Sequence, residues 1–224
     1  MKSIPKIVLS ELVWLVMFGV AVFLPAWTLA YWQAWVLLAV VIVLARIPGI
    51  YLLYTNPVAL QRRTRGGPRA ETRMVQKLVM GGLWFSLAAM LVVSALDHRF
   101  GWSKVPTALC LVGDVLVAVG LVLVMLVVVQ NSYAGATVRV ESDQKLVATG
   151  LYSLVRHPMY TGNVITMVGI PLALGSYWGL VFVVSGLTVL ALRIRDEEEL
   201  LEDELDGYRE YRRTVRYRLL PRIW

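Results

Sequence analysis

Long uncharged stretches dominate the pattern of hydrophobic and polar positions along the chain. No Asp, Glu, Lys or Arg lies between Glu11 and Arg46, and none lies between Arg156 and Arg193. A helix needs roughly 20 apolar residues to cross ~30 Å of hydrocarbon, so each stretch is long enough for two crossings. Because backbone polar groups in a bilayer must be paired within their own segment, these crossings are expected to be helices.

The pattern predicts an all-α, polytopic membrane bundle of about six helices. Gly169 and Pro171 interrupt the short fifth segment, which indicates a kink or a partial crossing and would leave five full spans. Aromatic residues, which favour membrane interfaces, mark turns near 25–32 and 175–179. The helices are expected at 8–26, 33–54, 77–97, 105–130, 159–174 and 177–194.

Lysine and arginine concentrate in segments that six spans would place on one side of the membrane. These segments are 55–77, 131–157 and the tail after residue 192, whereas the turns near 25–32 and 175–179 hold none. The positive-inside rule then puts both termini in the cytoplasm. We therefore interpret the net charge of +7 as a determinant of membrane orientation and a source of attraction to anionic lipids, rather than as a sign of nucleic-acid binding.

The composition supports a membrane protein and excludes several kinds of site. Of the 224 residues, 58% are hydrophobic and 17% are charged, whereas a soluble domain carries about a quarter charged residues. Cys110 is the only cysteine, which excludes a disulfide framework and a thiolate metal site. The two histidines, His98 and His157, fall on opposite predicted sides of the membrane, so no metal centre is expected.

Three charged residues fall inside the predicted spans, where charges are functional candidates. Glu11 and Arg46 lie at similar depth on neighbouring helices, so a structural ion pair is expected. Asp114 lies nearer the outer side, and the sequence assigns it no partner. These residues carry one alternative interpretation, in which the chain is a non-catalytic membrane protein or a small transporter.

The connection 131–158 is longer than a link between two spans requires, and such long loops are usually functional or disordered. It leads to Pro158, a residue suited to the first position of a helix. Arg156 and His157 would then stand at the helix start, where free N–H groups and the helix dipole favour a cofactor carboxylate or phosphate. Alternatively, both side chains cap the helix and bind lipid headgroups.

Acidic residues follow the last predicted span. The run 196–199 is entirely acidic, and apolar residues recur at spacings of three and four through 201–215. This spacing predicts an amphipathic helix that is broken at Gly207. Beside a basic interface, the acids would suit a cationic or hydroxyl-bearing ligand. Alternatively, this is a solvated juxtamembrane helix stabilised by Glu–Arg pairs.

Three ordered blocks of residues resemble a known family. They resemble the isoprenylcysteine carboxyl methyltransferases, and the related phospholipid methyltransferases share much of the pattern. The resemblance covers roughly residues 130–221, so we expect an N-terminal part over 1–100 and a methyltransferase core over 101–224. The blocks are Gly150-x-Tyr152-x-x-x-Arg156-His157-Pro158-x-Tyr160-x-Gly162, then Arg193-Ile194-x-x-Glu197-Glu198-x-x-Leu201, then Gly207-Tyr208-x-x-Tyr211-x-x-x-Val215 with Pro221.

The resemblance implies S-adenosylmethionine as methyl donor, S-adenosylhomocysteine as product, and a cytosol-facing pocket capped by the loop and the tail. It also implies a lipid-like or prenylated acceptor that enters from the bilayer. The cofactor-binding residues carried over are Gly150, Tyr152, Arg156, His157, Pro158, Tyr160 and Gly162, with Glu197 and Glu198 on the opposite wall and Tyr208 and Tyr211 closing the pocket. The catalytic residues carried over are Arg193, Glu197, Arg139 and Asn131.

The expected reaction is carboxyl methylation, because a carboxylate is already ionised at neutral pH and needs no general base. An amine acceptor would have to lose a proton, and the sequence shows no obvious dedicated base. Membrane sterol reductases that use NADPH share the RHP-x-Y-x-G string and are the alternative enzyme class. In them Asn precedes the Tyr and an acid follows the Gly, whereas this chain has Met159 and Asn163 there.

Overall fold

The computed structural model describes all residues except 1–3, 59, 61–72, 135–139 and 141–143, and the side chains from residue 13 onward. The described residues form helices and no strands, which confirms the predicted all-α class. The α-helices are α1 (Ile4–Ala26), α2 (Trp32–Thr55), α4 (Met74–Phe100), α5 (Thr107–Gln130), α6 (Pro158–Ala173), α7 (Val181–Glu204) and α8 (Tyr208–Thr214). Two short 3-10 helices cover Gly150–Ser153 and Trp178–Leu180.

Each of the six expected segments corresponds to one helix, and the boundaries of the first five differ by at most four residues. The sixth was expected to end at residue 194, but α7 continues for ten more residues, to Glu204. Among the described residues, four helices are long and apolar enough to cross a membrane: α2, α4, α5 and α7 with the 3-10 turn before it. The fifth expected segment is α6, which has 16 residues and contains Pro171. The chain is therefore a helical membrane protein, and its short fifth segment is confirmed.

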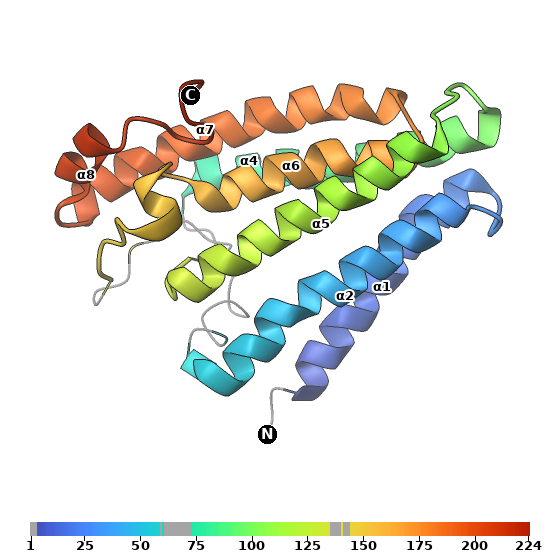
Figure 1. Cartoon of the computed structure of the whole chain (residues 1–224). Helices are drawn as coiled ribbons and strands as arrows, with labels where there is room; N and C mark the ends of the chain where they lie inside the picture. The colour runs from blue at the N-terminus through green and yellow to red at the C-terminus, as the bar shows by residue number, and fades with distance from the viewer. Residues whose placement is uncertain (1–3, 59, 61–72, 135–139, 141–143) are drawn as a thin grey trace.

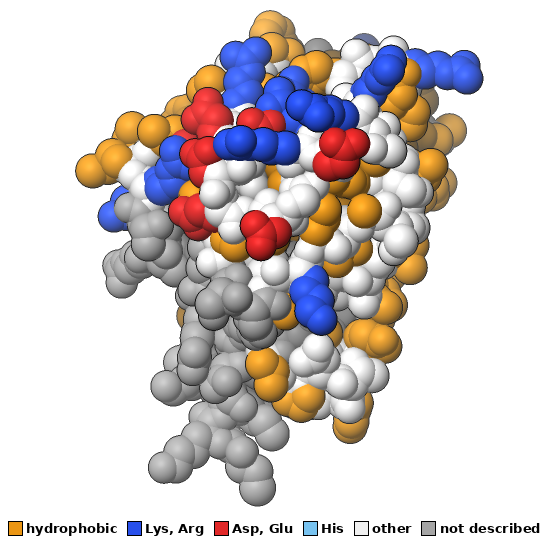
Figure 2. All heavy atoms as spheres, turned by 90° about the vertical axis from the view of Figure 1, so that its left-hand side faces the viewer, with side chains coloured by type: hydrophobic (Ala, Val, Ile, Leu, Met, Phe, Trp, Pro, Cys, Tyr) orange, Lys and Arg blue, Asp and Glu red, His pale blue; other side chains and the backbone are white. Residues whose placement is uncertain are grey.

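The helices run side by side, and their connections gather at two ends of the bundle (Figure 1). The turns between α1 and α2, between α4 and α5, and between α6 and α7 lie at one end. At the other end lie α8, the carboxy-terminal tail and the segment 144–157, and we call this the carboxy-terminal end. Figure 2 looks onto it and shows charged side chains gathered there, with hydrophobic side chains along the flanks.

Helices α5 and α6 approach so closely that only glycine fits between them. A Cβ added to Gly120 would lie 2.5 Å from the carbonyl oxygen of Gly162, and one added to Gly162 would lie 2.7 Å from that of Gly120. Gly169 meets the carbonyl oxygen of Gly113 in the same way, at 2.8 Å. Small residues that bring backbones together are the usual means of packing helices in lipid, where apolar side chains gain little from association.

At the end of the bundle opposite the carboxy-terminal end, the buried carboxylate of Asp97 connects the turn after α4 to the turn after α6. Asp97 accepts hydrogen bonds from the Ser103 backbone N–H at 2.6 Å, the Ser103 hydroxyl at 2.6 Å and the Ser176 hydroxyl at 2.5 Å. The main hydrophobic core includes Tyr31, Met90 and Leu174 and lies toward this end.

The charged residues predicted inside spans have different surroundings. Asp114 is buried, and its two carboxylate oxygens have no hydrogen-bond partner within the described part of the chain. Arg46 is exposed on α2. The side chain of Glu11 lies outside the described residues, so the Glu11–Arg46 ion pair stays a prediction.

Candidate active site

The start of α6 is fixed by the carboxy-terminal tail. Pro158 is the first residue of the helix, as predicted, and His157 precedes it. The backbone N–H groups of Arg156 and His157 donate to the carbonyl oxygens of Tyr217 and Arg218, each at 2.9 Å. The tail thus satisfies donors at a helix start that would otherwise need water or a ligand.

Glu198 of α7 is the anion at this helix start. Its Oε1 accepts from Arg156 Nε at 2.7 Å and lies 3.2 Å from His157 Nε2, while its Oε2 pairs with Arg218 Nη2 at 2.8 Å. Glu198 is 3% exposed, and Arg156 and His157 are each 6% exposed. Arg156 also donates to the carbonyl oxygens of Val215 and Arg216. The anion at this helix start is therefore a carboxylate of the chain itself, whereas the resemblance implied that Arg156 and His157 hold the cofactor.

A second contact joins the same two helices beside the first. The Tyr160 hydroxyl donates to Glu197 Oε2 at 2.5 Å, and Arg193 Nε donates to the Tyr160 oxygen at 2.9 Å. Arg193 is 3% exposed, whereas Glu197 is half-buried. Tyr160 thus links a buried cation to a carboxylate that retains an accessible surface.

The segment before α6 packs against α8. Asn131 Nδ2 donates to the Tyr152 hydroxyl at 3.0 Å, and the Tyr211 hydroxyl donates to the Tyr152 carbonyl oxygen at 2.7 Å. Burial raises the pKa of Tyr152 to about 12, with a smaller contribution from the negative charge of Glu197, although the Asn131 hydrogen bond lowers it. Gly207 has φ +81 and immediately precedes α8, which confirms the predicted break in the amphipathic segment.

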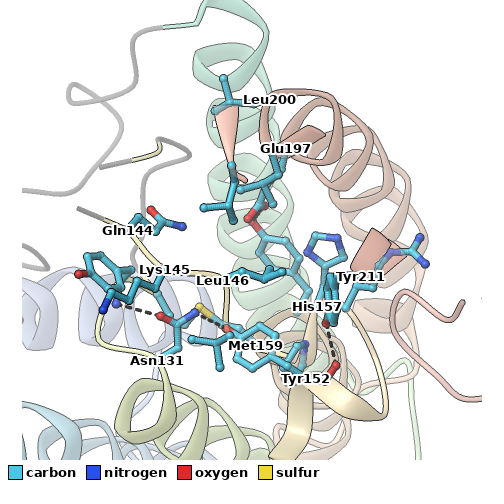
Figure 3. Close-up of a pocket in the computed structure, with 18 residues that line it drawn as sticks. Asn131, Gln144, Lys145, Leu146, Tyr152, His157, Met159, Glu197, Leu200 and Tyr211 are labelled. Atoms are coloured by element: carbon cyan, nitrogen blue, oxygen red, sulfur yellow. Dashed lines mark hydrogen bonds between the residues drawn. The ribbon is translucent and has the colours of Figure 1, made fainter. Parts of the chain in front are cut away.

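A polar cavity of about 820 Å³, including its open mouth, lies between these elements. Figure 3 shows Asn131, Gln144 and Lys145 on one side of it, with Glu197 and Leu200 of α7 on another. The lining thus combines a carboxylate, a lysine and amides with apolar side chains. The cavity therefore offers both positively and negatively charged groups, together with apolar surface against which an aromatic ring could pack.

A larger and mostly apolar cavity, of about 1210 Å³ including its opening, adjoins the first between the helices. Side chains of α4, α5, α6 and α7 line it, among them Met80, Trp84 and Leu190. Met159 and Tyr160 line both cavities, and Arg193 stands in the wall of the apolar one. One turn of α6 therefore separates a polar chamber from an apolar chamber.

The predicted site residues fall into three groups. Those that line the polar cavity are Asn131, Tyr152, Arg156, His157, Pro158, Tyr160, Glu197 and Tyr211. Within the described part of the chain, those that do not line it are Gly150, Gly162, Arg193, Glu198 and Tyr208. Tyr208 is buried in the cluster with Leu205 and Val215, and Gly150 holds a positive φ of +58 beside Gln130. Arg139 lies outside the described residues.

Sequence reasoning missed three kinds of residue at the site. Gln144 and Lys145 line the polar cavity, and their place in the long functional loop was the signal that could have found them. Met159 lies between two motif positions and was used only to separate enzyme classes. Gln76 of α4 binds Arg193 and Asp196, and nothing in the pattern around it marks that contact.

A comparison with protein families supports one class for this site. Residues 109–205 match the family model described as phospholipid methyltransferase. This region is similar to the phospholipid methyltransferase family. The family includes the membrane methyltransferases of the isoprenylcysteine type. Comparison with curated proteins gives no significant match.

The phospholipid methyltransferase match spans less than half of the chain and coincides with the structural site. It includes nearly all of α5, the connection to α6, α6 itself and all of α7. It therefore contains Tyr160, Glu197 and Glu198, whereas α4, α8 and the tail lie outside it. The elements that pack against the matched region from outside it are therefore α4, α8 and the tail.

Proposed function

We propose that the chain is an integral membrane methyltransferase that uses S-adenosylmethionine and acts on a lipophilic carboxylic acid. The observation that carries this proposal is the pair of adjoining cavities that share Met159 and Tyr160. A water-soluble donor and an apolar acceptor need such a pair of chambers, because methyl transfer requires both reactants in line at one point. The family match supports this class over the sterol-type reductase and the non-catalytic alternatives.

The polar cavity has the groups that the donor needs. S-adenosylmethionine supplies an electrophilic methyl group on a sulfonium and also carries an ammonium and a carboxylate. Glu197 would hold the ammonium or the ribose hydroxyls, and Lys145 would hold the carboxylate. The apolar side chains of Leu146 and Leu200 would cover the adenine. Glu198 would act indirectly, since its bonds to Arg156 and His157 fix the wall on which the donor rests.

The apolar cavity points to the acceptor. Arg193 places a buried cation in its wall, next to the Tyr160 hydroxyl. A cation at that position would attract and orient a carboxylate and repel a protonated amine. A carboxylate attacks without a general base, so the side chains need only exclude water and align the acceptor with the methyl group. An acyl or prenyl chain would extend among Met80, Trp84 and Leu190.

This function also sets the orientation in the membrane. The donor is a cytosolic metabolite in this proposal, so the carboxy-terminal end and both termini would face the cytoplasm. The arginines exposed near that end, such as Arg209 and Arg213, would contact anionic lipids of the inner leaflet. Thiol labelling of single cysteines introduced into the 25–32 turn and into α8 would test the orientation, because only the turn is expected to react from outside.

The first test measures donor binding by the purified full chain. Titration calorimetry in detergent or lipid nanodiscs is expected to show micromolar binding of S-adenosylhomocysteine. Glu197→Gln is expected to weaken it about tenfold, as the loss of a hydrogen bond to a charged group would. Glu199→Gln, an exposed neighbour on the same helix, is the matched control. Absence of binding by the wild-type chain in both media would overturn the methyltransferase proposal.

The second test identifies the nucleophile. The chain is supplied with radiolabelled donor and one of two probes, N-acetyl-S-farnesylcysteine or vesicles that contain phosphatidylethanolamine. A carboxyl product is a methyl ester, which releases labelled methanol in alkali, whereas an N-methyl product does not. The proposal expects alkali-labile label on the farnesylcysteine probe. Alkali-stable label on phosphatidylethanolamine, the outcome that the family's name favours, would replace the carboxyl assignment with amine methylation.

A further inference from the structure

One neutral amide of α4 bridges a cation and an anion of α7. Gln76 is fully buried, and its Oε1 accepts from Arg193 Nη1 at 2.9 Å. Its Nε2 donates to Asp196 Oδ2 at 2.5 Å and lies 3.4 Å from the Arg193 carbonyl oxygen. Asp196 is held on its other side by Arg73, with Nη2 to Oδ1 at 2.9 Å. The amide thus lies between two oppositely charged side chains.

The charges on either side determine which way the amide points. A carboxamide has an acceptor at one end and donors at the other, so it satisfies the guanidinium of Arg193 and the carboxylate of Asp196 at once. A charged side chain at this position would repel one of the two, and an apolar one would leave both without this partner. A glutamine at position 76 therefore satisfies both neighbours. At this buried position an unsatisfied donor or acceptor would lower the stability of the fold.

The bridge controls the direction of the Arg193 side chain. Gln76 holds one nitrogen of the guanidinium, and the Tyr160 hydroxyl holds Nε at 2.9 Å. Arg193 and Tyr160 both line the apolar cavity, whereas Gln76 is not among the described residues that line either cavity. Gln76 thus acts on the cavity only through another residue. Its effect would be on where the buried cation lies relative to a ligand.

We infer that Gln76 is a positioning residue that sets Arg193 for the anionic head of the acceptor. The inference rests on the proposed function, because it needs an acceptor whose negative group reaches the wall of the apolar cavity. Gln76 lies outside residues 109–205, so the family match assigns it no role. The N-terminal part of the chain would therefore take part in acceptor recognition by a polar contact as well as by its apolar surface.

A second hydrogen bond between α4 and α7 provides a matched control. The hydroxyls of Ser86 and Ser185 lie 3.1 Å apart, and Ser86 is buried as Gln76 is. Ser86 does not line either cavity among the described residues. A variant of Ser86 therefore reports what the loss of a polar link between these helices does by itself.

The experiment compares Gln76→Met, Gln76→Glu and Ser86→Ala in the full chain. Donor binding is measured with S-adenosylhomocysteine, and KM and kcat are measured with N-acetyl-S-farnesylcysteine. Gln76→Met is expected to raise KM for the anionic probe about tenfold while the dissociation constant of S-adenosylhomocysteine stays within about twofold. Ser86→Ala is expected to change neither. Gln76→Glu is expected to recover toward the wild-type KM as pH falls, because a protonated carboxyl again offers a donor and an acceptor.

Each other outcome has a defined meaning. An unchanged KM in Gln76→Met would overturn the inference, and so would an equal loss of donor binding and acceptor binding, which would indicate a purely structural link. If the wild-type chain binds S-adenosylhomocysteine but neither binds nor methylates the anionic probe, this inference and the carboxyl assignment both fail while the methyltransferase proposal stands. If donor binding is absent, the methyltransferase proposal itself fails.

Discussion

Arg156 Nε and Glu198 Oε1 lie 2.7 Å apart, although 42 positions separate the two residues in the chain. Both side chains are almost completely buried, and Arg218 and His157 approach the same carboxylate. A buried ion pair adds less to stability than its geometry suggests, because both ions lose their hydration. Removing one partner of such a pair is strongly destabilising, however, because the other charge then stays buried without a counter-ion.

Glu198→Gln is therefore expected to destabilise the fold. The neutral amide would leave Arg156 and Arg218 without their shared anion, at a cost of about 3 kcal/mol in the free energy of unfolding. A lower thermal midpoint and faster proteolysis of the tail after residue 205 would report this change. Glu199→Gln, which alters an exposed carboxylate on the same helix, is expected to leave both unchanged. Equal behaviour of the two variants would show that the buried cluster does not hold the tail.

The close contact of α5 and α6 gives a second prediction. Gly120→Ala would place a methyl group 2.5 Å from the Gly162 carbonyl oxygen and 2.9 Å from the Thr166 nitrogen, so the helices must separate. Such overpacking is expected to cost about 1–3 kcal/mol in stability. Gly81→Ala is the control, because nothing lies within 4 Å of its added Cβ. It is expected to stabilise α4 by roughly 0.5–1 kcal/mol. Thermal unfolding in detergent measures both, and tolerance of Gly120→Ala would contradict the described packing.

The raised pKa of Tyr152 leads to a prediction about the stability of the fold at alkaline pH. Its pKa is raised from 10.0 to about 12, so the phenol stays neutral in the folded protein at pH values where the unfolded chain ionises. The stability contribution is fully present below pH 10 and is lost as pH rises toward 12. Tyr152→Phe removes the ionisable hydroxyl and is expected to flatten this part of the stability profile. Phenolate absorbance and thermal midpoints across the range would test it, and an identical alkaline profile in the variant would refute it.

Lys145 provides a prediction for donor binding. It is exposed and lines the polar cavity, so its ammonium would pair with the donor carboxylate in a solvated setting. Pairs of this kind contribute up to about 1 kcal/mol. Lys145→Gln is accordingly expected to weaken S-adenosylhomocysteine binding about threefold, and less at high salt. Lys104→Gln, between α4 and α5 at the opposite end of the bundle, is the control. If Lys145→Gln leaves S-adenosylhomocysteine binding unchanged, or weakens it equally at all salt concentrations, Lys145 does not pair with the donor carboxylate.

The helices and part of the site could be predicted because their signals are local. Uncharged stretches mark the helices, since a bilayer penalises every charge within them. Pro158 marks the start of α6, and Gly207 marks the break before α8, because each residue suits one backbone conformation. The motif blocks predicted that the start of α6 faces the acids of α7, and the Tyr160–Glu197 hydrogen bond confirms it.

The remaining features depend on how distant segments pack. The sequence places Glu198 near basic residues but cannot say that the chain's own Arg156 and Arg218 take its charge. Gln76 is a single amide in an apolar helix, and its partners stand 117 and 120 positions further along. Its contact arises only when α4 packs on α7. No local pattern predicts that event.

The turn of α6 that carries Met159 and Tyr160 has a consequence for what happens after the reaction. In the proposed carboxyl methylation, the ester would lack the negative charge that draws the acceptor to Arg193, so the methylated molecule would be held less tightly and would return to the acyl chains of the bilayer. The spent donor would leave in the opposite direction, into water. Since these two exits would lie on opposite sides of the turn, neither product would block the arrival of the next pair of substrates.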